Sequence, residues 1–546
     1  MNRRNFLKKL TLTGAAPFML NGIPVYLFAR QSQLQRVAAG SFNDKVLIIL
    51  QLHGGNDGLN TIIPVDQYSL YYNLRPNIAI PANGSRKYIP LDSTLPIADQ
   101  VGLHPDMIGA KELYDQGKMA IIQGVSYENN NGSHFRGRDI WFMGGGYNDY
   151  FGSGWMGRYL DETYPGYPGN YPNDEMPDPL GLEIGTGISL AFHRESGIPA
   201  GLSVQNPQQF YNLINGVGGE LPTSIAESHY GDELAYIMGI EQQSNKYANR
   251  LKQVYDQGSN SSVIYPEKYL LNAPQGSLKN RLAGQLRLIA RLLSGGIKTK
   301  IFLARIGGFD THAEQVEPYD ATMGKHAALL YHISSAMKAF QDDLRNLGLE
   351  DRVVSLTYSE FGRRPKSNGS WGTDHGTGAP MMVFGKAVKP GIIGVNPDLN
   401  NLERNNIPQQ YDYRQPLTTI LQDWLGADDA TLDKTLFGEF KDKKLDLIGE
   451  VTSNKEAFFN NRFRLDHCYP NPVKDVTNIA FHINKAAVVK ITIYDEQGRL
   501  MQEVLNQQLQ PGKHQIQADL NTLKAGKYIY RLETDVFNEA KVLVKL

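Results

Sequence analysis

Residues 46–52 read Val-Leu-Ile-Ile-Leu-Gln-Leu, and His53-Gly-Gly-Asn-Asp57-Gly-Leu-Asn60 follows them directly. A nearly continuous apolar run of this length is typical of a β-strand covered on both faces, as in a parallel sheet flanked by helices. Four later runs have the same character: Met119–Val125, Lys300–Ile306, Arg352–Tyr358 and Pro380–Phe384. The repeated pattern predicts a sheet whose strands are buried on both sides.

Helical patterns lie between these runs. The stretch Asp106–Gln116 ends at Gly117, a residue type that commonly terminates helices. From His326 to Leu347 apolar residues recur at three- and four-residue spacing, which places them on one helix face. Strands that alternate with helices predict an α/β domain with a mostly parallel sheet. The section from about residue 144 to 275 is rich in Gly, Pro, Tyr and Asn and is expected to be an insertion.

Several familiar enzyme signatures are missing from the chain. The sequence contains no GxSxG, GxxxxGK or HExxH motif. These gaps argue against an α/β-hydrolase, a P-loop enzyme and a zincin.

Polar residues gather next to each predicted strand. Because ligands of open α/β sheets bind beyond the carboxyl ends of the strands, segments far apart in the chain are expected to share one edge. These segments are His53–Asn60, Asn129–Asp139, Gly307–His312 and Ser359–Arg364, with Gly372–Gly376 before the last strand. Their carboxylates, imidazoles and hydroxyls predict the functional site at this edge.

The chemistry of these side chains points to a divalent metal ion. Mixed Asp, Glu and His ligands suit zinc, manganese or iron, whereas a more oxygen-rich set suits magnesium or calcium. A metal held here could activate a bound water or hydroxyl and offset charge on an oxyanion. The candidate ligands are Asp57, Asp310, His312, Glu360, Asp374 and His375.

Ser133 precedes a predicted helix that begins near residue 135. Its hydroxyl would lie at a helix N-terminus, where free backbone N–H groups attract anions. Arg136 and Arg138 could make bidentate contacts to a phosphate or sulfate. With His134, these residues form the predicted catalytic set.

Each candidate also has a structural interpretation. Asn-Asp-Gly is a strong turn sequence, so Asp57 could cap a turn, and Ser133 could be a simple helix cap. Glu360 could pair with Arg363 or Arg364. The remaining residues with a structural alternative, in loop hydrogen bonds, ion pairs or the core, are His53, His134, Arg136, Arg138, Asp310, His312, Asp374 and His375.

Length and composition narrow the class of protein. The chain has 546 residues, which predicts more than one domain, and a formal net charge of −1. This balance argues against nucleic acid as the main partner. A single cysteine, Cys468, excludes an intramolecular disulfide and a zinc site built from several thiolates.

The N-terminus has the features of an export signal. Arg3-Arg-Asn-Phe-Leu-Lys8 resembles a twin-arginine signal, with a basic tail as the alternative, and we expect residues 1–30 to form the signal peptide. The apolar stretch from Leu10 to Ala29 is not predicted to be a transmembrane helix, because Gly and Pro interrupt it.

The last eighty residues change character. Short alternating runs predict a small antiparallel β-sandwich with strands at Val488–Tyr494, Gln515–Leu520, Lys527–Glu533 and Ala540–Leu546. The segments Tyr469–Pro472, Ile491–Arg499, Leu523–Tyr528 and Lys541–Lys545 resemble the C-terminal sorting domain of type IX secretion cargo. The resemblance covers residues 466–546, after a linker at 451–465. It implies secretion or attachment at the outer cell surface; a generic carbohydrate-binding or spacer sandwich is the alternative.

The strand-end motifs resemble a second family. They are His53–Asn60, Gly102–Pro105, Ser133–Arg136 with Asp139–Trp141, Gly308–His312, Ser359–Arg364 and Gly372–Gly376. Together they look like the domain-of-unknown-function family numbered 1501, which is grouped with the sulfatase and alkaline-phosphatase superfamily. The resemblance implies an alkaline-phosphatase-like α/β/α sandwich over about residues 44–450 and a metal-assisted esterase site.

The resemblance assigns roles residue by residue. Asp57 is similar to the superfamily's first metal-binding acid, and Ser133 to its nucleophile. Asp310 and His312 resemble an acid and histidine of one metal site, although they stand closer together than in the superfamily pattern. Glu360 occupies the place of a common Asp-His pair, and Asp374-His375 resembles the final histidine segment. These departures leave one ion, two ions or a degenerate site open.

We therefore expect a secreted or surface-attached, metal-dependent hydrolase of phosphate or sulfate esters. Its partners would be the twin-arginine and type IX export machineries and a small anionic ester or glycan substrate. The alternative is a non-catalytic surface protein of the same fold that binds a glycan or a protein.

Overall fold

The computed structural model describes residues 17–20, 23–26, 44–167, 169–216, 245–449, 464–465, 468–483, 485–534 and 538–546. The predicted signal peptide lies outside these ranges except for two short antiparallel strands, β1 (Pro17–Leu20) and β2 (Ile23–Tyr26). The predicted linker lies outside them except for residues 464–465.

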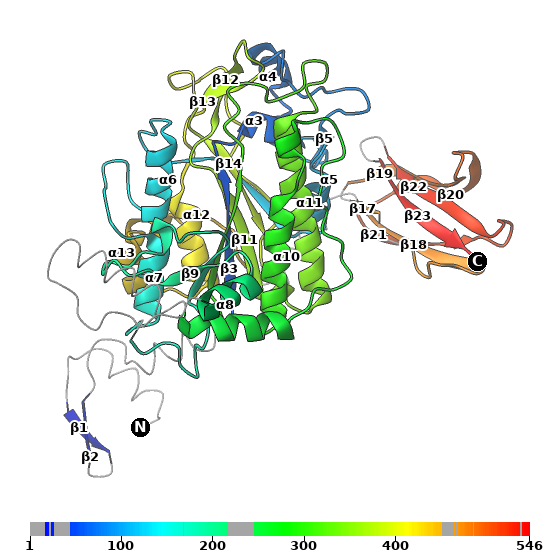
Figure 1. The fold of residues 1–546 in the computed structure, drawn as a ribbon. Coiled ribbons are helices and arrows are strands. Elements are labelled where there is room, and N and C mark those ends of the chain that lie inside the picture. The colour runs from blue at the N-terminus through cyan, green and yellow to red at the C-terminus, as the bar shows by residue number, and fades with distance from the viewer. Residues whose placement is uncertain are drawn as a thin grey trace.

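A nine-stranded sheet runs through the middle of the described N-terminal part (Figure 1). Its strand order is β15-β7-β14-β11-β3-β10-β8-β9, with β16 also beside β7. The pairs are parallel except those of β14, which is antiparallel to both β7 and β11. The predicted mostly parallel sheet is confirmed. The strands are β3 (Val46–His53), β7 (Met119–Ser126), β8 (Gly181–Glu183), β9 (Gly201–Ser203), β10 (Ile301–Gly307), β11 (Val353–Tyr358), β14 (Ala379–Phe384), β15 (Gly391–Ile393) and β16 (Tyr411–Asp412).

Helices cover both faces of this sheet. Successive residues of its central strand point to opposite sides, and because these residues are apolar, both faces need to be buried. In β3, Ile48 and Leu50 pack in one apolar core with α5 (Ile108–Asp115), α10 (Arg281–Ser294) and α11 (Lys325–Asn346). Leu47 and Ile49 pack in the other core. The helices of that second layer are α6 (His134–Met143), α7 (Trp155–Thr163), α12 (Arg414–Thr419) and α13 (Asp429–Thr435). The result is the expected α/β/α sandwich.

The section expected to be an insertion is partly built into the sheet. Strands β8 and β9 extend it beyond β10 in parallel register. This section also carries α7 and α8 (Pro207–Gly216), while residues 217–244 lie outside the described ranges.

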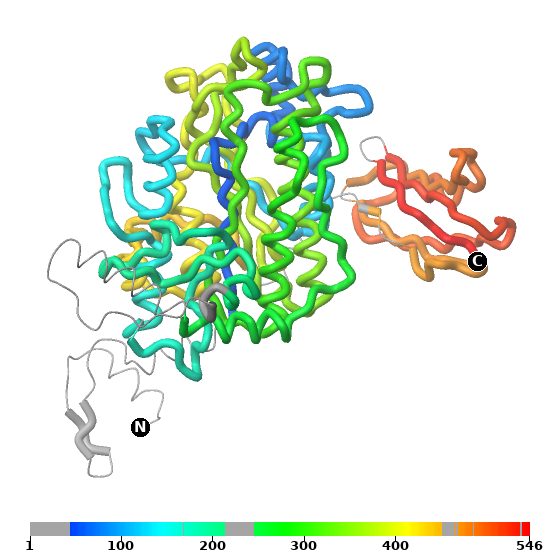
Figure 2. Tube along the Cα trace, in the orientation of Figure 1, coloured from blue at the N-terminus to red at the C-terminus, as the bar shows by residue number. Residues whose placement is uncertain are grey.

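Smaller elements sit over the edge where β3 ends. They comprise α3 (Gly58–Thr61), α4 (Tyr68–Leu74), a sheet of β4 (Ile62–Pro64), β6 (Val101–Leu103) and β5 (Ile89–Pro90), and a pair formed by β12 (Arg363–Ser367) and β13 (Thr373–His375). Because β14 is antiparallel to its neighbours, its first residue lies at the edge where the parallel strands end. The chain therefore passes from β13 into β14 at that same edge, as the tube in Figure 2 shows.

The C-terminal part forms two antiparallel sheets around a separate apolar core. Their strand orders are β17-β18-β21 and β20-β19-β22-β23. The strands are β17 (Arg464–Leu465), β18 (Val476–Ile483), β19 (Ala487–Asp495), β20 (Leu500–Leu509), β21 (Gly512–Asp519), β22 (Gly526–Glu533) and β23 (Asn538–Lys545). The predicted sandwich is confirmed. Strands β17, β18 and β20 were not predicted. Strand β20 lies at a sheet edge and is largely exposed on both faces, so it lacks clear alternation.

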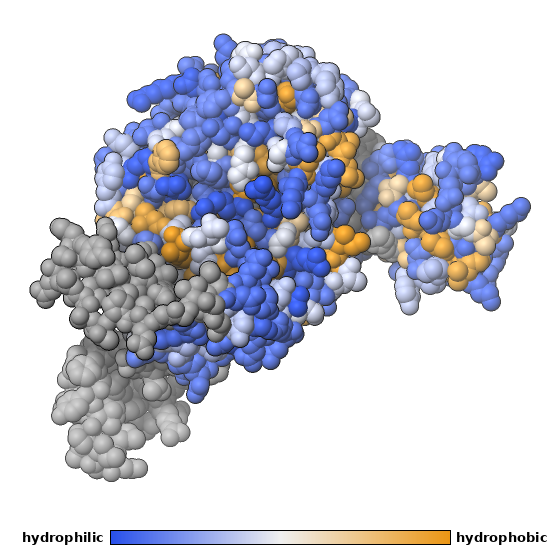
Figure 3. All heavy atoms as spheres, viewed as in Figure 1, coloured by the Kyte–Doolittle hydropathy of each residue, from blue (hydrophilic) through white to orange (hydrophobic). Residues whose placement is uncertain are grey.

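The surface is mostly hydrophilic on the face drawn in Figure 3, with scattered apolar patches. None of the helices within the described ranges combines the length and the apolarity that a bilayer crossing needs.

Substitution of a central core residue tests this packing. Ile48 in β3 is 0% exposed, so we expect Ile48→Ala to lower the free energy of unfolding by about 2–5 kcal/mol, through lost burial and a cavity. Urea unfolding of the full chain, followed by tryptophan fluorescence, measures the change. The matched control is Ile97→Ala, since Ile97 is 60% exposed and should cost much less. Equal effects of the two changes would contradict the layer assignment.

Candidate functional site

Three strand-end loops meet at the edge predicted from the sequence. The Gly54 N–H, just after β3, donates to Glu360 Oε1 beyond β11 at 2.8 Å. Gly54 has a φ of +124°, and a Cβ there would lie 2.3 Å from the backbone nitrogen of Asp310, which follows β10. Only glycine allows this approach, because any side chain would collide with that backbone.

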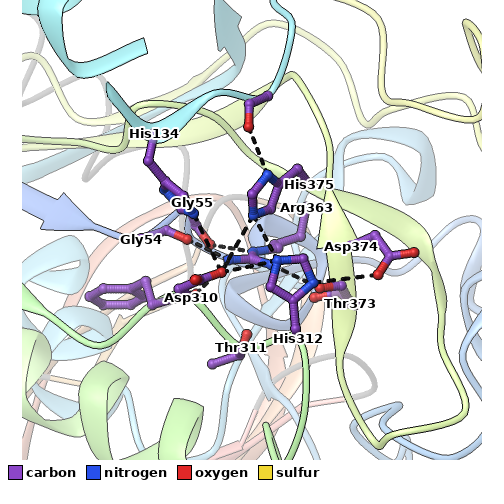
Figure 4. Close-up of polar contacts among 12 residues, drawn as sticks. Gly54, Gly55, His134, Asp310, Thr311, His312, Arg363, Thr373, Asp374 and His375 are labelled. Carbon is purple, nitrogen blue, oxygen red and sulfur yellow. Dashed lines mark hydrogen bonds and ion pairs between the residues drawn. The ribbon is translucent and has the colours of Figure 1, made fainter. Parts of the chain in front are cut away.

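Three imidazoles converge on one carboxylate oxygen (Figure 4). Asp310 Oδ1 lies 3.5 Å from His134 Nε2, 3.3 Å from His312 Nε2 and 3.4 Å from His375 Nε2. The Nε2 atoms of His312 and His375 are 2.8 Å apart. His134 opens α6, Asp310 and His312 follow β10, and His375 ends β13. We call these four residues the His/Asp cluster.

The second nitrogen of each imidazole faces an oxygen of the protein. His134 Nδ1 lies 2.8 Å from Glu360 Oε1, and His375 Nδ1 lies 2.7 Å from the Gly132 carbonyl oxygen. The Nδ1 atom of the third imidazole, His312, is 3.5 Å from Asp374 Oδ1. Because carbonyl and carboxylate oxygens accept hydrogen bonds, we assign the proton of His134 and of His375 to Nδ1. Their Nε2 atoms then carry a lone pair and no hydrogen, as in histidines that bind metals.

The distances from Asp310 Oδ1 to the three imidazoles fit a divalent cation such as zinc, whereas the 2.8 Å between His312 Nε2 and His375 Nε2 is shorter than in such a site. Zinc–nitrogen bonds of about 2.0–2.1 Å place the ligand atoms of a tetrahedral site about 3.3 Å apart. The distances of 3.3–3.5 Å from Asp310 Oδ1 agree with this edge length. His134, Asp310 and His375 offer ligand atoms within 4.8 Å of one another. Within the described part of the chain, His134 Nε2 is buried and has no hydrogen-bond partner, which a bound cation would provide.

Arg363 holds the carboxylate of the cluster in its charged form. Its Nη2 atom donates to Asp310 Oδ1 at 2.5 Å. Although partial burial raises the pKa of Asp310, the hydrogen bond and charge of Arg363 outweigh it and lower that pKa to about 2. The hydrogen bond from His134 to Glu360 raises the pKa of His134, whereas burial lowers that of His375.

The structure does not bring Asp57 to the cluster. Its side chain is 0% exposed, and Arg75 Nη1 lies 2.7 Å from both carboxylate oxygens. Gln315 Nε2 donates to Asp57 Oδ2 at 2.6 Å. Burial raises the pKa of Asp57, but Arg75 more than compensates and the net shift is downward. The carboxylate is thus committed to a buried ion pair beneath the site.

Glu360 and Asp374, also expected as ligands, stand behind the histidines instead. Glu360 is buried and accepts hydrogen bonds from Gly54 and His134, so it orients an imidazole. Asp374 faces His312 Nδ1 in the same way. The predicted alternative was a pair of Glu360 with Arg363 or Arg364. Among the described residues, Glu360 Oε1 instead contacts Gly54, His134 and His53, and Arg363 contacts Asp310.

Besides His134, the predicted catalytic set contains three residues at the start of α6: Ser133, Arg136 and Arg138. Ser133 is the N-cap of α6, and its Oγ accepts from the Arg136 N–H at 3.3 Å. Its neighbour His134 belongs to the cluster, and its other neighbour, Gly132, contacts His375 through its carbonyl oxygen. Arg136 donates to the Asp149 carbonyl oxygen at 2.6 Å and stacks on Tyr150, whereas Arg138 pairs with Asp139.

Two residues of the site had no usable signal in the sequence. Arg75 follows α4, 18 residues after Asp57, and Gln315 is an isolated amide in a loop. Neither belongs to a pattern of ligand-type residues, so only their contacts identify them.

Two family models match this chain. The family described as "Protein of unknown function (DUF1501)" matches residues 44–408, so the chain belongs to this family, as its strand-end motifs indicate. The "Secretion system C-terminal sorting domain" matches residues 467–545. This domain indicates secretion or attachment at the cell surface. The comparison with curated proteins finds no match.

Several solved structures resemble the chain at low identity. A protein in the alkaline phosphatase superfamily from Vibrio parahaemolyticus is 11% identical, with 87% of this chain and 91% of that chain covered and a TM-score of 0.31. The PsFucS1 sulfatase from Pseudoalteromonas sp. is 11% identical, with 91% and 89% covered and a TM-score of 0.29. The lipoteichoic acid synthase LtaP from Listeria monocytogenes is 10% identical, with 85% and 88% covered and a TM-score of 0.28.

The buried pair of Asp57 and Arg75 predicts a dependence of stability on pH. Asp57→Asn should lower the free energy of unfolding by about 3–5 kcal/mol at neutral pH, because Arg75 keeps an uncompensated buried charge. Since folding lowers the pKa of Asp57, its contribution is complete above about pH 4 and is lost as the pH falls further. Urea unfolding of both proteins from pH 7 to pH 3 should show the difference narrowing. Asp115→Asn, at a surface pair with Lys111, is the control and should change little.

Proposed function

We propose that the His/Asp cluster binds a divalent cation, zinc among the candidates, and that the protein hydrolyses phosphate or sulfate esters. One observation carries the proposal: three imidazole Nε2 atoms from separate segments face one carboxylate oxygen, and each Nδ1 faces an oxygen of the protein. Side chains that serve only packing have no reason to bring three imidazole nitrogens to one carboxylate oxygen.

A cation bound here would supply Lewis acidity, which favours negative charge on an ester oxygen. The residues of the chain position it. Glu360 and the Gly132 carbonyl fix two imidazole rings, and Arg363 keeps Asp310 ionised. Asp310 and His312 have side chains that are 50% and 48% exposed, so a substrate can reach the cluster from solvent.

Ser133 is the proposed nucleophile. Its Oγ would bond to the phosphorus or sulfur atom while the ester bond breaks and the alcohol leaves with the bonding pair. The hydroxyl proton passes to solvent, and a water molecule then releases phosphate or sulfate and restores the serine. The positive end of α6 favours an anion at this position, and Arg136 adds positive charge nearby although its guanidinium donates to the Asp149 carbonyl oxygen.

The proposed substrate is extracellular, since the C-terminal sorting domain indicates secretion or surface attachment. We further propose that the Arg3-Arg4 segment directs the first export step through the twin-arginine route.

Removal of one ligand should remove both the metal and the activity. We expect the full-length protein to retain zinc after gel filtration and to hydrolyse aryl phosphates or aryl sulfates. His375→Ala should lose the zinc, measured by elemental analysis, and at least about 100-fold in kcat/KM, equivalent to about 2.7 kcal/mol of transition-state stabilisation. His514→Ala, in the C-terminal sandwich, is the control and should keep both. A folded wild-type protein without bound metal and without hydrolysis would overturn the proposal.

A pair of substitutions separates the two roles of Ser133. Ser133→Asn retains a good helix cap but lacks a hydroxyl, whereas Ser133→Ala lacks both and should cost about 1 kcal/mol of stability. If Ser133 is the nucleophile, both variants lose at least about 100-fold in kcat with normal zinc content. Activity that survives in Ser133→Asn would show that the residue only caps α6.

A further inference from the structure

Beneath the His/Asp cluster, a buried polar network joins the two loops that carry most of its members. Gln315 is 0% exposed and has two contacts through its amide oxygen. Its Oε1 accepts from Thr311 Oγ1 at 2.8 Å and from Thr373 Oγ1 at 3.0 Å. Both threonines are 0% exposed as well. These hydrogen bonds are therefore not replaced by water in the folded protein.

The two threonines are direct neighbours of the cluster in the chain. Thr311 stands between Asp310 and His312, and Thr373 is two residues before His375. The Thr373 N–H also donates to the Thr311 carbonyl oxygen at 3.0 Å. One amide thus links the loop after β10 to β13, although these segments are about sixty residues apart.

Asp57 determines the orientation of the Gln315 side-chain amide. Its Nε2 donates to Asp57 Oδ2 at 2.6 Å, and a carboxylate can only accept there. A flipped amide would place its oxygen against this carboxylate and leave both threonine hydroxyls without their acceptor. Arg75 holds the carboxylate on its other side. The chain of contacts runs from Arg75 through Asp57 and Gln315 to the two loops.

We propose that Gln315, oriented by Asp57, is a positioning residue that holds Asp310, His312 and His375 in the geometry needed to bind the cation. The inference rests on the proposed metal centre and deepens it. It gives Asp57, a candidate ligand by sequence, a different role: its negative charge acts on the cluster through an amide. The two segments also share backbone hydrogen bonds, such as that from the Thr373 N–H to the Thr311 carbonyl oxygen, so loss of the amide would loosen them without separating them and would lower the affinity for metal.

The test compares isosteric variants of the full chain. Gln315→Met keeps the length of the side chain but removes both hydrogen-bonding groups, while Thr311→Val and Thr373→Val each remove one hydroxyl. Zinc affinity is measured by competition with a chromophoric chelator. We expect Gln315→Met to lower the affinity by about 10–100-fold, as for other residues that orient metal ligands. Each valine variant should lower it by a smaller factor.

The control is Thr299→Val. Thr299 is 0% exposed and donates one hydrogen bond, to the Pro179 carbonyl oxygen at 2.7 Å. It stands just before the first residue of β10, whereas Thr311 follows the last residue of that strand. It therefore matches Thr311 in burial and bonding without contacting the network, and its zinc affinity should stay within about twofold of the wild type. Circular dichroism confirms that each variant is folded.

A second measurement does not depend on metal. Hydrogen exchange of the metal-free proteins should become faster in both segments 308–316 and 368–376 of Gln315→Met, and in neither segment of Thr299→Val. If the wild type binds zinc and Gln315→Met binds it equally well, the inference is wrong while the metal centre stands. If the wild type binds no zinc, the proposed function fails, and unchanged exchange in Gln315→Met would overturn the link between the loops as well.

Discussion

One buried guanidinium holds together the segments on which the site depends. Arg363 is 1% exposed and donates to the carbonyl oxygens of Gly55 and Thr373 at 2.9 and 2.8 Å, and to Asp310 Oδ1 at 2.5 Å. It reaches the carbonyl oxygens of Gly54 and Phe309 too. Arginine suits this position because its five N–H donors lie in one plane and its charge is permanent. The loops after β3 and β10 and the strand β13 are therefore fixed around one side chain.

The site has two layers with different degrees of exposure. In the upper layer, the half-exposed Asp310 and His312 leave the cluster open to solvent. In the lower layer, Asp57, Arg75 and Gln315 are completely buried, so their charges and dipoles interact in a medium of low polarity. An unpaired charge in this layer would be costly, and accordingly each oxygen of Asp57 has a partner. The exposed upper layer is accessible to a ligand, while the buried lower layer supports it rigidly.

Sequence reasoning predicted that the polar loops meet at one edge of the sheet, but not which of their acidic residues lie against the histidines. Asp310, His312, His375 and His134 were expected at one edge and do meet there, because parallel strands end on the same side of a sheet. Asp57 and Glu360 were expected among the ligands for the same reason. The structure gives both carboxylates other partners. Arg75 forms an ion pair with Asp57, and His134 and Gly54 form hydrogen bonds with Glu360. No local sequence pattern predicts which arginine or which N–H group will bind a given carboxylate.

The amino-acid sequence by itself determined the five strands β3, β7, β10, β11 and β14, the helices α5, α6 and α11, four strands of the C-terminal sandwich, the family and the edge that holds the polar loops. It could do so because apolar periodicity and glycine turns are local properties, readable within about ten residues. Only the tertiary structure decided which side chains share a point in space. Contacts such as those of Arg363 with Gly54 and of Gln315 with Asp57 join residues more than 250 positions apart. Such contacts form only when two groups are placed to within a few tenths of an ångström. The fold of the whole chain sets this placement, and the residue type alone does not.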